Sequence, residues 1–397
     1  MKRDASFLAV GLVLLFGGVS VALIQYKVPT ILMPLMETFS LDSTTASWLM
    51  SIFTLMTVLF AIPASILAIR FGEKRVMISG LLLAIVGSIL GLFSESSVTL
   101  LFSRALEGIA LTIVTACGPI LVRRCVPERR LGITMGIWGI WGCLGSTIAS
   151  VTVPTLFSLG GFGAVWSVYA AVAAIAALAL GVMIHVPESP KTSEQHIPEE
   201  KRLKLLSQIR QIVNKETVLF YVAFALFNIC LLAVLAFVPT ILQMNGYDST
   251  LSGFLSTAPM LLSIASSPLF GALSDRTGKL KGLLVLAMLV MGPCTFVMYN
   301  YTGAALIVGV LVMGLVGMGG IGLFLTGYSQ LVEKENMTTA MGLFITVQGI
   351  GQFLGTFLVQ ALLGPEFTNT LFAGMLLLVM GLIGAGVLCK CKIGQDS

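Results

Sequence analysis

The sequence predicts an all-helical membrane protein with twelve spans, and three observations carry this prediction. Apolar residues make up 57% of the 397 residues, and charged residues make up only 10%. A soluble domain carries roughly 25% charged residues, so this chain has too few to cover a globule with polar surface. Apolar runs of about 20 residues, long enough for a spanning helix, recur from end to end. Membrane-spanning strands would instead show short segments that alternate apolar and polar residues.

A polar segment over 187–215 divides the twelve apolar runs into two groups of six. We therefore expect an N-terminal six-helix bundle over 1–186, a cytoplasmic linker over 187–215 and a C-terminal six-helix bundle over 216–397. Part of the linker, 199–212, is expected either to lie on the anionic inner leaflet as a basic amphipathic helix or to be solvated. The spans are expected near 7–36, 45–69, 76–94, 98–122, 132–158, 163–186, 217–244, 250–274, 282–300, 303–331, 338–363 and 367–389. The first and tenth are longer than a bilayer requires, so we expect them to tilt or to project from it.

The positions of Lys and Arg predict the orientation of these spans. If both termini are cytoplasmic, 21 of the 23 Lys and Arg residues fall in inner loops, the linker or the tails. The only charged residues in the outer loops are then acidic (Glu37, Asp42, Glu95, Asp248 and Glu366), which fits the excess of Lys and Arg on the cytoplasmic side of membrane proteins. We expect a multi-pass protein of the cytoplasmic (inner) membrane. The two exceptions, Lys27 and Arg104, fall within spans.

Several functional classes are not expected from this sequence. The net charge of +5 is scattered through short loops, so we expect no nucleic-acid partner. The seven cysteines mostly lie in apolar runs without metal-ligand spacing, so we expect neither disulfides nor a metal site. The sequence shows no His/Asp/Ser constellation and no nucleotide-binding loop, so we expect no enzyme activity and no cofactor. A non-transporting membrane receptor or sensor is the alternative of another class; it would need a soluble output domain, which we do not expect here.

The two halves of the sequence resemble each other. Residues 28–32, VPTIL, recur as residues 238–242, near the outer ends of the first and seventh spans. Four further matches share one offset of 206 residues: Gly72 and Gly278, Gly108 and Gly314, Met135-Gly136 and Met341-Gly342, and Gly145 and Gly351. The common offset indicates a duplication. Repeats that build a central site at their interface are typical of transporters.

The loop after the eighth span carries the most specific motif, with Gly271, Asp275, Arg276 and Gly278 in the stretch GALSDRTGKLK. This stretch resembles the G-x-x-x-D-R-x-G-R-K signature of the Major Facilitator Superfamily (MFS). The resemblance implies the MFS fold, with 12 transmembrane helices in two pseudo-symmetric six-helix halves that transport by alternating access. Gly271 would allow close helix approach and Gly278 a tight turn. Asp275 would pair with cations at the cytoplasmic mouth and latch one state of the cycle.

The first-half copy of this motif is degenerate. It keeps Arg70 and Gly72 but has Ile69 at the position of the acid, where Glu73 could partly substitute. The fifth span lacks the Gly-Pro signature of drug/proton antiporters of the family, which counts against a drug exporter. The run over 123–145 is most similar to the cyanate, nitrate and organic-anion transporters of the superfamily.

Three ionisable residues, Lys27, Arg104 and Glu107, fall within spans, where a central charge costs roughly 2.5–3.5 kcal/mol on insertion scales. The resemblance places the first, fourth, seventh and tenth spans around a central cavity, and both cations fall in its outer half. Arg104 and Glu107 are three residues apart and share a helix face. They either neutralise each other as a structural pair, or Arg104 binds substrate while Glu107 exchanges protons. Lys27 either snorkels to the outer headgroups or lines a pocket beside Tyr26.

These charges sum to +1, which favours an anionic substrate, and Arg104 could grip a carboxylate with two parallel hydrogen bonds. Protonation of Glu107 would leave +2, so binding of a proton and of an anion would be linked. We therefore expect a proton-coupled transporter of a small organic anion, with a multidrug or lipid exporter as the alternative. The expected partners of the anion transporter are the anion, protons and the lipid bilayer, and we expect the protein to be a monomer. Glu107 is the expected coupling acid, and the expected substrate contacts are Tyr26, Lys27, Arg104, Asn228, Phe237, Tyr328 and Gln348.

Overall fold

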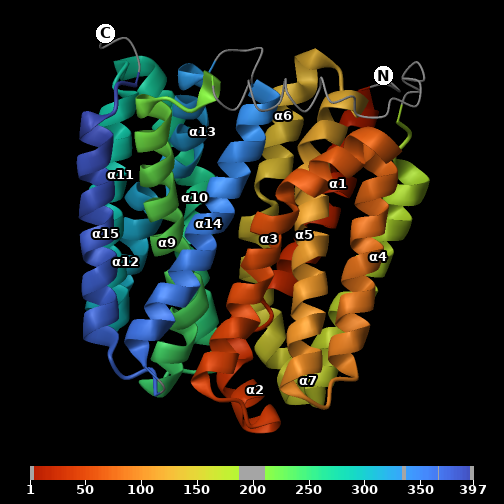
Figure 1. The fold of residues 1–397 in the computed structure, drawn as a ribbon, viewed down its shortest axis with the longest axis vertical. Coiled ribbons are helices and arrows are strands. Elements are labelled where there is room, and N and C mark those ends of the chain that lie inside the picture. Colours follow the sequence, from red (N-terminus) through yellow and green to blue (C-terminus); the bar gives the residue numbers. More distant parts are fainter. Residues whose placement is uncertain (1–3, 187–210, 333–336, 365, 394–397) are drawn as a thin grey trace. The chain divides into compact units, whose positions relative to one another are not determined.

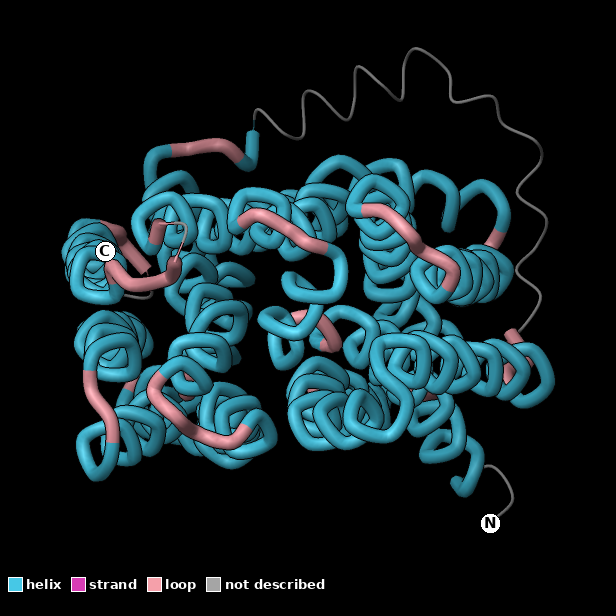
Figure 2. The backbone as a smooth tube through the Cα atoms, turned by 90° about the horizontal axis from the view of Figure 1, so that it is seen from below, coloured by secondary structure: helices cyan, strands magenta, loops and turns pink. Residues whose placement is uncertain are grey.

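The described part of the chain is built from helices. The computed structural model describes residues 4–186, 211–332, 337–364 and 366–393, and no strand lies among them (Figure 2). The chain forms two compact units: unit 1 comprises 1–187, 235–261 and 356–369, and unit 2 comprises 188–234, 262–355 and 370–397. Residues 187–210, most of the expected linker and of its amphipathic helix, lie outside the described residues. The division of the chain at 187–215 therefore stays a prediction.

The helices of the first half lie in unit 1. In chain order they are α1 (Asp4–Tyr26), η1 (Pro29–Ile31), α2 (Leu32–Phe39), α3 (Ser43–Phe71), α4 (Glu73–Leu92), α5 (Ser97–Cys125), α6 (Glu128–Gly139) and α7 (Trp141–Met183). Helix α5 packs between α3 and α4, and α1 packs against both α5 and α7 (Figure 1). This arrangement brings the first half of α5, with Arg104 and Glu107, against the end of α1, which is followed by Lys27.

The second half contains α9 (Lys215–Met244), α10 (Ser249–Thr277), α11 (Leu280–Asn300), α12 (Gly303–Val312), η2 (Met313–Gly317), α13 (Gly320–Leu331), α14 (Met337–Leu363) and α15 (Thr370–Lys390). Within unit 2, α11 packs against α15 and against the three pieces α12, η2 and α13. The last ten residues of α9, the first thirteen of α10 and the last eight of α14 fall within the residues assigned to unit 1.

Within the described residues, eleven helical segments are long and apolar enough to cross a membrane. One of them, Thr134–Met183, is 50 residues long. At about 1.5 Å per residue it would be roughly 75 Å long, more than twice the bilayer core. Non-helical backbone at Gly160 and Gly161 interrupts it, and Gly161 has φ of 62°. The predicted spans 132–158 and 163–186 are therefore two crossings joined by a tight glycine turn, which is consistent with twelve spans in the MFS fold.

The two spans that the sequence marks as overlong are both interrupted. The first is helical to Tyr26, then continues as the short 3-10 helix Pro29–Ile31 and as α2. The tenth changes to a π-helical turn over Met313–Gly317 and resumes as a regular helix at Gly320. Their extra length is thus taken up, at least in part, by changes in helix geometry rather than by one long straight helix. Pi-helical turns occur frequently at functional sites.

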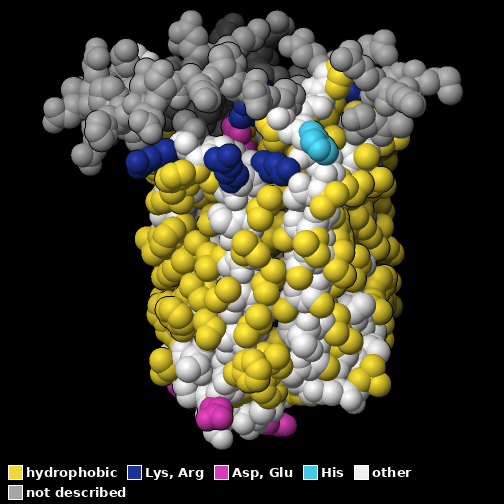
Figure 3. All heavy atoms as spheres, turned by 90° about the vertical axis from the view of Figure 1, so that its right-hand side faces the viewer, with side chains coloured by type: hydrophobic (Ala, Val, Ile, Leu, Met, Phe, Trp, Pro, Cys, Tyr) yellow, Lys and Arg dark blue, Asp and Glu magenta, His cyan; other side chains and the backbone are white. Residues whose placement is uncertain are grey.

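The side chains of α4 have the distribution expected of a helix against lipid. Its buried positions are mostly small, among them Gly80, Ala84, Gly87 and Gly91. Large apolar side chains of the same helix, such as Leu82, are exposed. Small residues at helix interfaces let backbones approach closely, which membrane helices require because lipid is as apolar as leucine. Figure 3 shows one face of the protein with a broad apolar band; Lys and Arg side chains gather at its upper edge, with one acidic patch among them, and the charged side chains at the lower edge are acidic.

The repeated glycines take equivalent structural positions in the two halves. Gly72 and Gly278 both have positive φ, 88° and 66°, in the turns that follow α3 and α10. Gly145 lies against α1, where an added Cβ would come within 2.2 Å of the Ala22 Cβ. Gly351 lies against α9, where an added Cβ would come within 2.6 Å of a backbone oxygen. The duplication inferred from the sequence is therefore also visible in helix packing.

Candidate functional site

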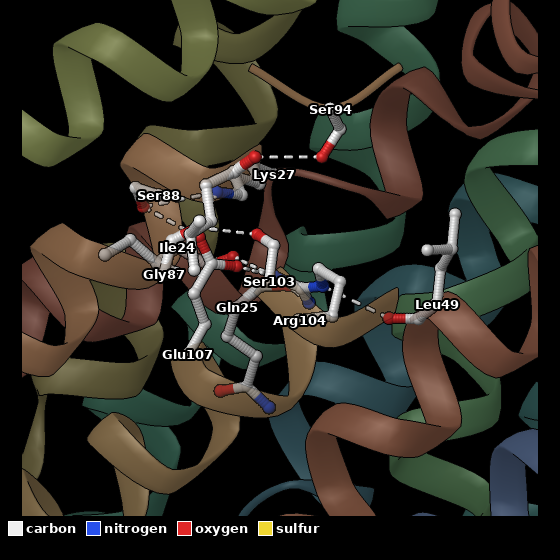
Figure 4. A network of polar contacts seen from close by, with 11 residues as sticks. Ile24, Gln25, Lys27, Leu49, Gly87, Ser88, Ser94, Ser103, Arg104 and Glu107 are labelled. Atoms are coloured by element: carbon white, nitrogen blue, oxygen red, sulfur yellow. Dashed lines mark hydrogen bonds and ion pairs between the residues drawn. The ribbon is translucent and has the colours of Figure 1, made fainter. Parts of the chain in front are cut away.

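Three ionisable side chains predicted to lie within spans meet in unit 1. One carboxylate oxygen of Glu107, Oε1, lies 2.6 Å from the Lys27 ammonium nitrogen. The other, Oε2, lies 2.7 Å from Nη1 of Arg104. The side chains of Lys27 and Glu107 are fully buried, and that of Arg104 is 2% exposed. We call this cluster of Lys27, Arg104 and Glu107 the charge triad (Figure 4).

Glu107 links the two cations of the charge triad, because each of its carboxylate oxygens forms an ion pair with a different cation. The Ser88 hydroxyl on α4 adds a further hydrogen bond to Glu107 Oε1, at 2.7 Å. The Lys27 ammonium also reaches the Ser88 oxygen, at 3.5 Å. Helix α4 can approach this closely because an added Cβ at Gly87 would lie 2.9 Å from the Glu107 Cγ. Lys27 thus points into the bundle and does not snorkel to a headgroup layer.

Arg104 also satisfies backbone carbonyls that a helix end leaves open. Its Nη1 donates to the Ile24 carbonyl at 2.8 Å, and its Nη2 donates to the Gln25 carbonyl at 3.2 Å. In a continuous helix Gln25 would accept from residue 29, but Pro29 has no N–H, and the last carbonyls of any helix lack partners. A cation at a helix C-terminus is also favoured by the helix dipole. Arg104 therefore stabilises the end of α1 as well as the position of Glu107.

The charge triad lies among aromatic rings and neighbouring backbone. The Lys27 nitrogen lies 4.1 Å from the centroid of Trp166, and the Arg104 guanidinium carbon lies 4.4 Å from that of Phe53. Arg104 Nε donates to the Leu49 carbonyl at 3.1 Å. Both rings offer their negative faces to a cation. Every nitrogen of the Arg104 guanidinium thus donates to an identified acceptor, and the positive charges are held away from water.

Glu107 neutralises one of the two cations and leaves a net charge of +1. An unpaired charge in a low-dielectric interior is costly, and an additional negative charge at the charge triad would balance it. An incoming carboxylate could supply that charge, or it could replace Glu107 once Glu107 is protonated. Such an exchange would bring a proton and an anion together at one point.

Three of the predicted contacts from the second half lie on α9, α13 and α14. Asn228 donates to the Phe224 carbonyl of its own helix at 2.9 Å. Tyr328 hydrogen-bonds to the Tyr221 hydroxyl and donates to the Ala340 carbonyl at 2.9 Å. Gln348 is half-buried in α14, and these three residues belong to unit 2.

Two other predicted contacts lie within unit 1. Phe237 is fully buried, with its ring 6.3 Å from that of Phe367. Tyr26 is 8% exposed and is next to Lys27 in the chain.

Sequence reasoning missed three members of this site, Ser88, Trp166 and Phe53. Ser88 carried only a weak signal, because it is one of three serines, with Ser79 and Ser94, in a largely apolar span. Trp166 and Phe53 carried no sequence signal, since aromatic residues are common in membrane helices that have no ligand. Only the folded chain shows that both rings face cations.

The loop motif has different charge partners in the two halves. The sequence predicted that Glu73 could partly substitute for the missing acid at Ile69 in the first half. In the first half, Glu73 accepts from Arg124, with 2.5 Å between its Oε2 and the Arg124 Nη1. Arg70 stacks on the neighbouring Phe71 at 5.2 Å. In the second half, Asp275 and Arg276 are exposed, and neither forms an ion pair within the described residues. Glu73 thus pairs with a cation although the usual acid position is Ile69. The predicted latch role of Asp275 stays a prediction.

Comparisons with known proteins agree with this architecture. The sequence profile described as Major Facilitator Superfamily matches residues 14–356. Two curated proteins, both described as MFS-type transporter ppzB, share 31% identity (Metarhizium rileyi, strain RCEF 4871) and 30% identity (Metarhizium majus, strain ARSEF 297) over 80 residues. These stretches cover 20% of this chain and only 17% and 18% of the relatives.

Solved structures show the same fold over almost the whole chain. The D-xylose-proton symporter superposes with a TM-score of 0.78 at 14% identity, covering 98% of this chain and 99% of that one. A bacterial homologue of the human lysosomal transporter Spinster, in an inward-facing and unoccupied conformation, gives 0.76 at 15% identity, covering 99% of both chains. A mutant of the nucleoside transporter NupG gives 0.77 at 15% identity, covering 96% of this chain and 99% of that one.

Proposed function

This chain belongs to the Major Facilitator Superfamily, and from that membership we propose that it is a secondary transporter of a small, carboxylate-like organic anion. It moves the anion across the cytoplasmic membrane by alternating access and couples this movement to protons through Glu107. It works as a monomer with both termini in the cytoplasm. The observation that carries the proposal is one buried carboxylate shared by two buried cations.

The charge triad supplies a simple coupling mechanism. While Glu107 is ionised it occupies both Lys27 and Arg104, so a substrate carboxylate has to compete with it. When Glu107 takes up a proton, the two cations lose their counterion and attract the substrate anion instead. Proton and anion then favour each other's binding by the same factor, as thermodynamic linkage requires. Loss of the anion on the far side returns Glu107 to its cations and releases the proton.

A purely structural role for the charge triad makes different predictions. Arg104 holds two carbonyls at the end of α1 and one in α3, so its removal disturbs the fold whether or not it binds substrate. Lys27 makes no backbone hydrogen bond among those identified, and its contacts are Glu107, Ser88 and the Trp166 ring. Lys27 is therefore the better residue for separating substrate binding from folding.

The test uses purified protein in nanodiscs and in proteoliposomes. Thermal unfolding is measured with small mono- and dicarboxylates and, separately, with cationic drugs. We expect a carboxylate to raise the unfolding temperature of the wild type but not of Lys27→Gln. The matched control Lys215→Gln, which removes an exposed cation of the same sign, should respond like the wild type.

The stabilising carboxylate then serves as substrate in proteoliposomes. A pH gradient should drive its uptake by the wild type and not by Glu107→Gln. Uptake by Glu107→Gln that still follows the pH gradient would disprove the coupling role of Glu107. Stabilisation by cationic drugs alone would overturn the substrate class and favour the multidrug or lipid exporter.

A further inference from the structure

Gln25, in the last turn of α1, uses its backbone and its side chain for different purposes. Its carbonyl accepts from Arg104 Nη2 at 3.2 Å. The residue is only 8% exposed, yet its side-chain amide forms no hydrogen bond with any residue that the structure describes. Figure 4 shows this amide directed away from Lys27, with no bond to the other residues drawn. Most buried polar groups are hydrogen-bonded, so a buried amide without a partner favours a ligand.

The Gln25 amide borders open space rather than packed protein. Among the described residues, neither of its amide atoms belongs to the fully enclosed side-chain atoms that lack a partner. The preceding positions on the same stripe of α1, Gly18 and Ala22, are filled by α7. An added Cβ at Gly18 would lie 2.8 Å from the Trp141 Cβ, and one at Gly145 would lie 2.2 Å from the Ala22 Cβ. Gln25 follows one turn beyond this close packing and has room at its amide.

The amide is neutral, whereas the charge triad beside it has a net charge of +1. Because the Gln25 carbonyl touches Arg104, a carboxylate at the charge triad would lie within a short carbon chain of the Gln25 amide. A second carboxylate at this amide would lose its hydration without gaining an opposite charge, and an ammonium group would lie near two cations. A neutral hydroxyl or carbonyl group suits the amide better, since the amide can both donate and accept.

We propose that Gln25 is a specificity-determining residue that selects short monocarboxylates bearing a neutral hydroxyl or carbonyl group. The carboxylate binds at the charge triad, and the Gln25 amide accepts from the hydroxyl or donates to the carbonyl of the same molecule. An acid without such a group leaves the amide unsatisfied and binds more weakly. This inference rests on the proposed anion transport and narrows its substrate class.

The experiment is calorimetric titration of the purified protein in nanodiscs with acids of matched carbon skeletons. Lactate, pyruvate and propionate share three carbons, and 3-hydroxybutyrate and butyrate share four. We expect at least one oxygenated acid to bind about five- to tenfold more tightly than its plain parent, the effect of roughly one hydrogen bond. Alanine adds an ammonium group to propionate, and succinate replaces the methyl group of butyrate with a second carboxylate. Neither should bind more tightly than its parent.

Gln25→Leu removes the amide and keeps the backbone carbonyl that holds Arg104. It should bind propionate and butyrate like the wild type and lose the preference for the oxygenated acids. The matched control Gln211→Leu, at an exposed glutamine of unit 2, should keep that preference. If Gln25→Leu does not fold, Gln25→Met, which keeps an unbranched side chain, takes its place with the same expected result.

Three results would overturn this inference and leave the anion-transport proposal standing. They are equal binding of oxygenated and plain acids by the wild type, a preference that persists in Gln25→Leu, and tighter binding of alanine or succinate than of the oxygenated acids. The inference also fails alone if none of these acids binds while another carboxylate stabilises the protein. If no carboxylate binds, both proposals fail.

Discussion

The first and the tenth spans are both interrupted, but their freed backbone groups are satisfied by different chemistry. Where α1 ends before Pro29, the Arg104 guanidinium donates to the Ile24 and Gln25 carbonyls. In the π-helical turn of the tenth span, the Ser266 hydroxyl donates to the Gly314 carbonyl at 2.8 Å. Beyond that turn, the Gly322 N–H donates to the Ser267 hydroxyl at 3.2 Å. One half uses a buried ion where the other uses two neutral hydroxyls.

The repeat offset shows how completely the charges are confined to the first half. Adding 206 residues to Arg104 and Glu107 gives Val310 and Met313, both apolar. In the VPTIL repeat, Lys27 corresponds to Phe237. The prolines behave differently as well, because α1 has ended before Pro29 whereas α9 continues through Pro239. The duplicated scaffold therefore does not require the charge triad, which suggests a function particular to the first half.

The largest expected difference between the halves is the cost of losing Glu107. Glu107→Ala leaves Lys27 and Arg104 buried without a counterion and should lower the free energy of unfolding by about 3–5 kcal/mol. The double variant Lys27→Met with Glu107→Gln should recover part of this loss because it also removes a cation.

Equilibrium unfolding in mixed micelles measures these effects. The second-half counterpart, Met313→Leu, changes shape at nearly constant volume and should cost less than about 1.5 kcal/mol. Equal losses for Glu107→Ala and Met313→Leu would show that the charge triad is not an energetic centre of the fold.

The close helix contacts at Gly145 and Gly351 test whether the two halves pack their helices in the same way. Gly145→Ala and Gly351→Ala place a methyl group 2.2 Å from Ala22 and 2.6 Å from the Ala225 carbonyl oxygen, respectively. Each should cost about 1–3 kcal/mol, the usual range for overpacking. Gly136→Ala and Gly342→Ala are the matched controls, because an added Cβ there meets nothing within 4 Å. The same unfolding assay applies, and a loss confined to one half would contradict equivalent packing.

The smallest effect is expected at the hydroxyl that supports the tenth span. Ser266→Ala leaves the Gly314 carbonyl without its side-chain donor and should cost about 0.6 kcal/mol and at most about 1.7 kcal/mol, as measured for polar contacts between membrane helices. Ser256→Ala, whose hydroxyl bonds to its own helix, is the control and should be close to neutral. A Ser266→Ala loss as large as that of Glu107→Ala would show that neutral and ionic support are equivalent here.

Much of the architecture could be predicted from the sequence because membrane spans are set by length and hydropathy. The apolar runs, the repeat offset and the glycine turns at Gly72 and Gly278 all correspond to features of the structure. The turn at Gly160–Gly161 falls between the predicted spans 132–158 and 163–186, as expected, whereas the break at Pro29, inside the predicted span 7–36, was not predicted. Proline and glycine are frequent in membrane helices, and neighbouring groups decide whether the helix continues there.

The charge triad, too, was predictable from the sequence only in part. The sequence by itself determined that three charges lie in spans and that Arg104 and Glu107, three residues apart, can pair on one helix face. Only the tertiary structure decided that Lys27, 80 residues from Glu107, joins them and that Trp166 and Phe53 cover the cations. Local spacing fixes contacts within a helix, whereas contacts between helices depend on how α1, α4, α5 and α7 rotate and pack. No single span contains that information, because each helix is positioned by the faces of all its neighbours.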